Sequence, residues 1–116
     1  MNINTLIGQT LIGYEVSSDK ERLTLKTKDK SYRMWHRQDC CESVYLEDIS
    51  GDLDDLLHSP ILQAEESTND DNRPANADCS FTWTFYRLST TKGQVVLRWL
   101  GQSNGYYGEG VDFDEV

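Results

Sequence analysis

Apolar and polar residues alternate along much of this chain, and that alternation constrains its fold more than any other feature. In RLTLKT, residues 22–27, two leucines are separated by a threonine, which is the period-two pattern of a half-buried strand. SYRMWHR, residues 31–37, repeats the pattern: one predicted face carries Tyr32, Met34 and His36, and the other carries Arg33, Trp35 and Arg37. The pattern predicts antiparallel strands that each bury one face.

The C-terminal half carries the two longest strand patterns. FTWTFYRL, residues 81–88, alternates aromatic residues with threonines, and QVVLRWLG, residues 94–101, follows after a turn at Lys92-Gly93. This spacing predicts a hairpin. PILQAEES, residues 60–67, is typical of a further strand, and VDF, residues 111–113, of an edge that closes the sheet.

SGDLDDLLHSP, residues 50–60, predicts the one helix. Ile49, Leu53, Leu56 and Leu57 are spaced at i, i+4, i+7 and i+8, which places them on one apolar stripe. Pro60 would end the helix, and so short a helix must be held by packing on a sheet. We therefore predict an α+β fold, with a five- or six-stranded, mostly antiparallel sheet and one short helix packed on a face.

The length of 116 residues predicts a single domain over residues 1–116, with a flexible acidic loop at residues 67–80, STNDDNRPANADCS. No apolar run is long enough to span a membrane, and MNINTLIGQT lacks the basic and apolar regions of a secretory signal. Three cysteines, two of them adjacent, do not resemble a disulfide framework. These features predict a reducing cytoplasm as the compartment.

The net charge of −9 is concentrated in the middle of the chain: residues 41–80 contain eleven Asp and Glu and a single Arg. A field of this sign repels nucleic acid and anionic membranes and attracts basic protein surfaces, although acidity also serves solubility alone. The carboxylates expected to engage a partner are Glu47, Asp48, Asp52, Asp54, Asp55, Glu65 and Glu66.

HRQDCCE, residues 36–42, gathers an imidazole, two thiols and two carboxylates. Neighbouring side chains on an extended strand point to opposite faces, so the thiols of Cys40 and Cys41 are poor joint ligands and we predict no metal site. Nearby carboxylates raise the pKa of a thiol, which makes cysteine-based catalysis the lesser alternative. We favour a strand-end corner with buried thiols, in which Asp39 and Glu42 bind backbone N–H groups.

GQSNGYYGEG, residues 101–110, predicts a glycine-rich turn at Asn104-Gly105, because both residues tolerate positive φ. One ring of the Tyr106-Tyr107 pair is expected to be exposed as a contact surface; alternatively, a tyrosine packs on the sheet. If this turn meets residues 36–42, the two would form a ligand pocket. Its predicted lining is His36, Asp39, Cys40, Cys41, Glu42, Ser103, Asn104, Tyr106 and Tyr107.

The ordered motifs DCCE, GDL.DL, PI..AEE, TWTFY and SNGYY resemble those of a family of small uncharacterised proteins encoded by tailed bacteriophages and bacterial genomes. The resemblance covers nearly the whole chain. It implies a phage or prophage setting, and no activity or cofactor. In that setting, small acidic single-domain proteins are often host-takeover or counter-defence factors, which is an association by context.

Two functions follow as expectations. The first is a non-catalytic inhibitor in the host cytoplasm, whose acidic surface engages a basic site on a host protein or complex, without a cofactor and without direct contact with nucleic acid or membrane. The second is a small-molecule binder that sequesters a nucleotide signal in the pocket described above. The acidic balance, with no basic cluster near the pocket beyond Arg37, counts against an anionic ligand. A third interpretation, a virion-associated component, predicts a self-assembling oligomer.

Overall fold

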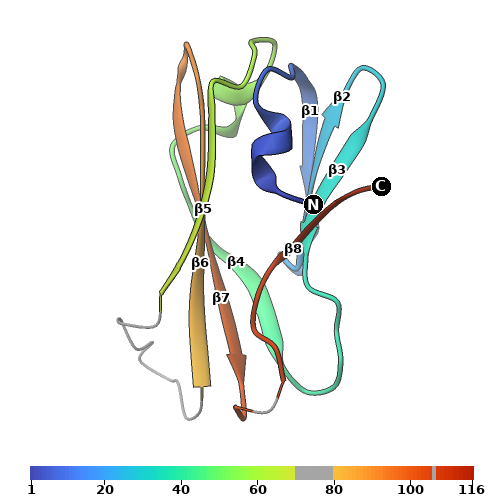
Figure 1. Ribbon diagram of the computed structural model, residues 1–116, viewed down its shortest axis with the longest axis vertical. Coiled ribbons are helices and arrows are strands. Elements are labelled where there is room, and N and C mark those ends of the chain that lie inside the picture. The colour runs from blue at the N-terminus through green and yellow to red at the C-terminus, as the bar shows by residue number, and fades with distance from the viewer. Residues whose placement is uncertain (70–79, 106) are drawn as a thin grey trace.

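The computed structural model describes residues 1–69, 80–105 and 107–116, and these residues form an all-β fold of two four-stranded antiparallel sheets (Figure 1). The strand orders are β1-β2-β3-β8 and β4-β7-β6-β5. The first sheet contains β1 (Leu11–Val16), β2 (Arg22–Thr27), β3 (Ser31–Trp35) and β8 (Asp112–Glu115). The second contains β4 (Ser43–Ser50), β5 (Gln63–Asn69), β6 (Ser80–Thr90) and β7 (Gly93–Ser103). Two 3-10 turns complete the elements, η1 (Ile3–Leu6) and η2 (Leu53–Leu56).

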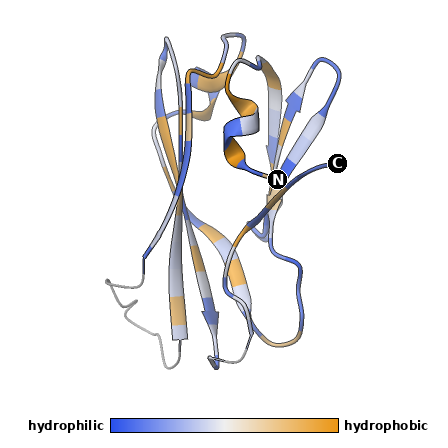
Figure 2. Ribbon diagram, viewed as in Figure 1, coloured by the Kyte–Doolittle hydropathy of each residue, from blue (hydrophilic) through white to orange (hydrophobic). Residues whose placement is uncertain are grey.

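The inner faces of both sheets contribute to one buried cluster. Buried residues recur at every second position in β2, β3 and much of β7. Figure 2 shows hydrophobic segments on strands of both sheets. From the first sheet the cluster takes Leu23, Leu25, Tyr32, Met34 and Phe113, and from the second Leu46, Tyr86, Leu88, Val95, Leu97 and Trp99. The turns η1 and η2 add Ile3, Leu6, Leu53 and Leu56. The domain is therefore held together by contacts between the two sheets and not by either sheet alone.

The expected α+β fold is wrong, because the described residues contain only two four-residue 3-10 turns in place of the predicted helix. Within residues 50–60, Asp52 caps η2, but Leu57 is already extended at φ −89° and ψ 147°. Leu57 and His58 instead bond to β1: Leu57 bridges Leu11, and the N–H of His58 donates to the carbonyl of Leu11 at 2.8 Å. Pairing with a strand distant in sequence therefore overrides the local helical pattern.

The leucine stripe nevertheless faces the core, because Leu53 and Leu56 are buried. Of the other two members of the predicted stripe, Leu57 is half-buried and Ile49 belongs to β4. The expectation of a single sheet is also wrong, because the strands form two four-stranded sheets. The predicted flexible loop at residues 67–80 begins and ends in strands, since β5 runs to Asn69 and β6 starts at Ser80; residues 70–79 lie outside the described residues.

The second sheet extends beyond the first. Strands β6 and β7 have 11 residues each, whereas the strands of the first sheet have four to six. Beside this extension lie the loop between β3 and β4 and the segment that leads from β7 into β8 (Figure 1). The two loops singled out in the sequence therefore meet at one end of the molecule.

Candidate functional site

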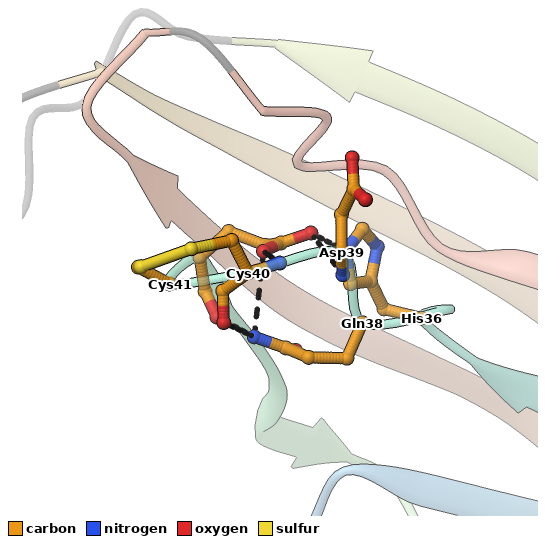
Figure 3. Close-up of a disulfide and its surroundings, with 6 residues drawn as sticks. His36, Gln38, Asp39, Cys40 and Cys41 are labelled. Carbon is orange, nitrogen blue, oxygen red and sulfur yellow. Dashed lines mark hydrogen bonds and ion pairs between the residues drawn. A yellow bond between two sulfur atoms is a disulfide. The ribbon is translucent and has the colours of Figure 1, made fainter.

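The loop between β3 and β4, residues 36–42, is built around the buried carboxylate of Glu42 (Figure 3). Glu42 Oε1 accepts the backbone N–H of Cys40 at 2.8 Å, and Oε2 accepts that of Asp39 at 3.0 Å. Gln38 Nε2 donates to the carbonyl oxygens of Glu42, at 2.6 Å, and Cys40, at 3.0 Å. The carboxylate thus binds N–H groups that lie outside the strands, as predicted for Glu42.

His36 joins this loop to the segment before β8. Its Nε2 lies 2.8 Å from Glu42 Oε2, and its Nδ1 lies 2.7 Å from the carbonyl oxygen of Gly110. Both ring nitrogens face acceptors, so the protonated imidazolium, which donates from both, fits this position.

The contacts of His36 and Glu42 shift both pKa values in the direction that favours an ion pair. Burial lowers the pKa of His36, but the hydrogen bonds to Glu42 and to the Gly110 carbonyl outweigh it and raise the pKa above its ordinary value. The hydrogen bond from His36, followed by that from the N–H of Cys40, lowers the pKa of Glu42 to about 2.

Cys40 and Cys41 form a disulfide between sequence neighbours, and both residues are exposed (Figure 3). Two expectations are therefore wrong, namely that the two sulfurs point apart and that the thiols are buried. The first applies to an extended strand, whereas these residues lie in an irregular loop, where adjacent side chains can converge. Asp39 is exposed and contributes its backbone N–H, so among the two predicted carboxylates only Glu42 holds the loop.

The segment after β7 is anchored by a second buried carboxylate, that of Glu109. Glu109 Oε2 accepts the hydroxyl of Ser103 at 2.5 Å, and Oε1 accepts that of Thr82 at 2.8 Å. Gly101 allows this close approach, because a Cβ there would overlap the carbonyl oxygen of Glu109. The segment is therefore fixed against the inner face of β6 and β7.

The predicted pocket is formed only in part. A surface depression of about 340 Å³ is lined by His36, Arg37, Gln38, Asp39, Glu42 and Gly108. Ser103 is used to hold Glu109, Asn104 is exposed in the turn, and Tyr107 is half-buried. Tyr106 lies outside the described residues. Among the described residues, His36 and residues 108–110 join the two loops.

The predicted acidic surface is divided between two edges of the second sheet. Five carboxylates, which we call the acidic edge, lie on β4 and η2: Glu47, Asp48, Asp52, Asp54 and Asp55. Glu65 and Glu66 lie on β5, at the opposite edge of the β4-β7-β6-β5 order. Three strand spacings of about 4.8 Å separate these edges, so the two groups form separate patches.

An aromatic–arginine cluster was missed by sequence reasoning. Trp35 on the outer face of β3 has three guanidinium groups around its ring: the Cζ atoms of Arg33, Arg37 and Arg22 lie 4.0, 5.6 and 5.7 Å from its centroid. Alternation indicated that Arg33, Trp35 and Arg37 share a face. The position of Arg22 beside Trp35 depends on strand register, because the two residues pair across β2 and β3.

Residues 1–69, 80–105 and 107–116, which the structure describes, contain no group of three or more His, Cys, Asp or Glu side chains arranged to hold a metal ion. Nor do they include a helix that is long and apolar enough to cross a membrane.

The family model described as a domain of unknown function, DUF7448, matches residues 4–113 of this chain. The chain therefore belongs to that family. No curated protein and no solved structure matches it.

Proposed function

Since membership of this family brings no activity with it, we propose from the arrangement of charge that the protein is a non-catalytic binding module whose acidic edge engages a basic surface on a partner protein. The two halves of the fold differ sharply in charge. Residues 1–37 and 111–116, which include the first sheet, carry seven Asp and Glu and seven Lys and Arg. Residues 38–110 carry 13 acidic and four basic residues and so account for the entire net charge of −9.

The observation that carries the proposal is the acidic edge, with five carboxylates in nine residues of β4 and η2. Asp48, Asp52 and Asp54 are exposed. Asp52 Oδ1 accepts the N–H of Asp54 at 2.9 Å, and Asp54 Oδ1 accepts the hydroxyl of Tyr14 at 2.7 Å. These contacts hold the carboxylates in place before binding, which lowers the conformational entropy that an interface must overcome.

Two cations near the acidic edge are already engaged, and a third, Lys20, lines a surface depression together with Glu47 and Asp48. Arg98 Nε donates to Glu47 at 2.6 Å, and Lys92 Nζ donates to the carbonyl oxygen of Leu57 at 2.6 Å. These cations offset the charges of Asp48, Asp52 and Asp54 only in part, so the three carboxylates can still steer a basic partner, an effect that salt screens.

The setting follows from the resemblance to phage-encoded proteins. In it, the partner is a host protein or complex with a basic surface in the bacterial cytoplasm, and occupation of that surface inhibits the partner, as a host-takeover or counter-defence factor does. A stable interface of standard size would bury about 1,600 Å² in total, which extends over more of the surface than the acidic edge itself.

The contacts of His36 support the non-catalytic part of the proposal. Nucleophilic catalysis by Cys40 or Cys41 would require the reduced pair and a base that is free to take the thiol proton. His36, the base nearest to them, is held between Glu42 and the carbonyl of Gly110.

The test is capture of partners from bacterial lysate with two charge-matched variants. D48N/D52N/D54N removes three charges from the acidic edge, and Asn at position 52 can still cap η2. E15Q/E21Q/D29N removes three charges from the first sheet and its turns. The proposal expects the first variant to lose a protein that the wild type and the second variant retain. Equal capture by all three would contradict it.

A second candidate is the binding of a small molecule at the corner, where residues 36–42 meet residues 108–110. The depression lined by His36, Asp39 and Gly108 favours this candidate. A ligand at 100 times its Kd should stabilise the fold by about 2.7 kcal/mol. Unchanged melting temperatures across a broad nucleotide panel would retire this candidate.

A further inference from the structure

Trp35 lies on the outer face of the first sheet, next to the corner formed by residues 36–42, and three arginines surround it. Arg33 Cζ lies 4.0 Å from the Trp35 ring centroid, and Arg33 Nε donates to Asp114 at 2.7 Å. Trp35 Nε1 also donates to Asp114, at 3.3 Å. Asp114 therefore fixes the relative orientation of the Arg33 guanidinium and the indole ring.

The other two guanidiniums remain available for a ligand. Among the residues that the structure describes, Arg22 and Arg37 form no ion pair, although both lie under 6 Å from the Trp35 centroid. Each guanidinium carries five N–H donors in a planar fork that matches phosphate geometry. A flat apolar ring with two such forks under 6 Å from its centroid combines a stacking surface with anion binding.

Three carboxylates around this cluster accept hydrogen bonds from the protein itself, and a fourth, Glu21, lines the depression beside Arg22. Asp114 accepts from Arg33 and Trp35, and Asp112 Oδ2 accepts the N–H of Arg37 at 3.1 Å. Asp19 accepts the Ser17 hydroxyl at 2.6 Å and the N–H of Glu21 at 2.9 Å. Their charges still weaken the local positive field, so the cluster suits a ligand with one or two negative charges better than a polyanion.

Three surface depressions adjoin the tripeptide Trp35-His36-Arg37. One of about 400 Å³ includes Trp35, Arg37 and Asp112, and one of about 270 Å³ includes Arg22, Trp35 and His36. The third is the depression of about 340 Å³ at the corner, which includes His36 and Arg37. Volumes of this order suit a small planar ligand.

We propose that the Trp35 cluster binds a nucleoside phosphate, with the base stacked on the indole or a guanidinium plane and the phosphate held by Arg22 or Arg37. This extends the small-molecule candidate, which lies at the corner, to the adjoining Trp35 cluster and names its ligand class; it rests on that candidate and is independent of the acidic edge. A base with a phosphate is also the end of a nucleic-acid strand. The net charge of −9 repels a polyanion, so the free nucleotide is the expected ligand.

The test uses the three indole N–H signals of the full chain in ¹H–¹⁵N NMR spectra, because Trp83 and Trp99 serve as internal controls for Trp35. The probes are AMP and GMP, each titrated to about 5 mM so that a millimolar Kd is detected. Adenosine and ribose 5-phosphate separate the contribution of the base from that of the phosphate. A single-stranded oligonucleotide separates a free nucleotide from a strand end.

A shift of the Trp35 signal with AMP or GMP, larger than with adenosine or ribose 5-phosphate, is the expected result. R22Q/R37Q should weaken the affinity at least about tenfold, because it removes charge-assisted hydrogen bonds. R87Q, at an exposed arginine on β6, is the matched control and should leave the affinity unchanged.

An unmoved Trp35 signal with every nucleotide would overturn the proposal, as would equal affinity of the wild type and R22Q/R37Q. Tighter binding of the oligonucleotide than of AMP would contradict the free nucleotide as the ligand. If nucleotides raise the melting temperature without moving the Trp35 signal, this inference fails and the small-molecule candidate survives. If nucleotides change neither the melting temperature nor the Trp35 signal, both this inference and the small-molecule candidate fail.

Discussion

His36 Nε2 lies 2.8 Å from Glu42 Oε2, with the carboxylate side chain fully buried and the imidazole 10% exposed. The second ring nitrogen of His36 binds Gly110, so this pair connects the loop after β3 to the segment before β8. The corner between the two sheets therefore depends on an imidazole whose pKa is raised by its hydrogen-bond partners.

Stability should vary with pH through this pair. Because the folded-state pKa of His36 is raised, its contribution is complete below its ordinary value of 6.5 and is lost as the pH rises through the folded-state value. Because the pKa of Glu42 is lowered from 4.5 to about 2, its contribution is complete above pH 4.5 and is lost as the pH falls toward 2. The pair is most stabilising between these limits.

The measurement is urea unfolding of the wild type and H36Q at about pH 3, 5.5 and 8.5. Glutamine can donate a hydrogen bond but cannot become charged. The difference in unfolding free energy between the two proteins should be largest at the middle pH. A difference that is the same at all three values would show that the charge of His36 contributes nothing.

Thiol counting tests the Cys40–Cys41 disulfide. The chain has three cysteines, so purified oxidised protein, denatured without reductant, should show one titratable thiol, and reduced protein three. The variant C79S should show none before reduction and two after it. Three thiols in the denatured wild type before reduction would rule out the disulfide. In the reducing cytoplasm proposed above, the pair would be reduced.

Gly101 should not tolerate a side chain. Alanine there would overlap the carbonyl oxygen of Glu109, and relief of that overlap should cost about 1–3 kcal/mol of unfolding free energy. G13A is the control, since a Cβ at Gly13 meets nothing within 4 Å. Denaturant unfolding compares the two variants, and equal stability would mean that the Glu109 segment does not cross β7 as described.

The leucines of η2 should contribute to the core although they form no α-helix. Leu56 is 1% exposed, so L56A should cost about 2–5 kcal/mol. Leu62, in the connection that follows, is 57% exposed, and L62A should change the stability by less than about 0.5 kcal/mol. Similar losses in the two variants would contradict the placement of η2.

Period-two patterns located most of the strands, because apolar and polar residues alternate along a strand that buries one face. They could not divide the strands between sheets. That division follows from long-range pairs such as Met34 with Phe113 and Leu46 with Trp99, which join segments more than 50 residues apart. The same limit explains the helix error, since the leucine spacing of residues 49–57 suits a helix, and only pairing with Leu11 selects the extended form at Leu57.

The candidate sites were predictable to the extent that they are local. HRQDCCE was identified as a corner, and the role of Glu42 follows from a carboxylate near free N–H groups. The partner of His36 at Gly110 lies 74 residues away, and Arg22 reaches Trp35 only through strand register. Contacts of this kind depend on the assembled fold, which is why the arginine cluster was missed.

The most direct test of the proposed function is the affinity of the purified, captured partner for the wild type and D48N/D52N/D54N, measured at low and high salt. If the acidic edge is the interface, the wild type should lose roughly tenfold or more in affinity as salt rises from about 50 to 500 mM, and the variant should bind weakly with little dependence on salt. Equal affinities and equal salt dependence for the two proteins would contradict the account.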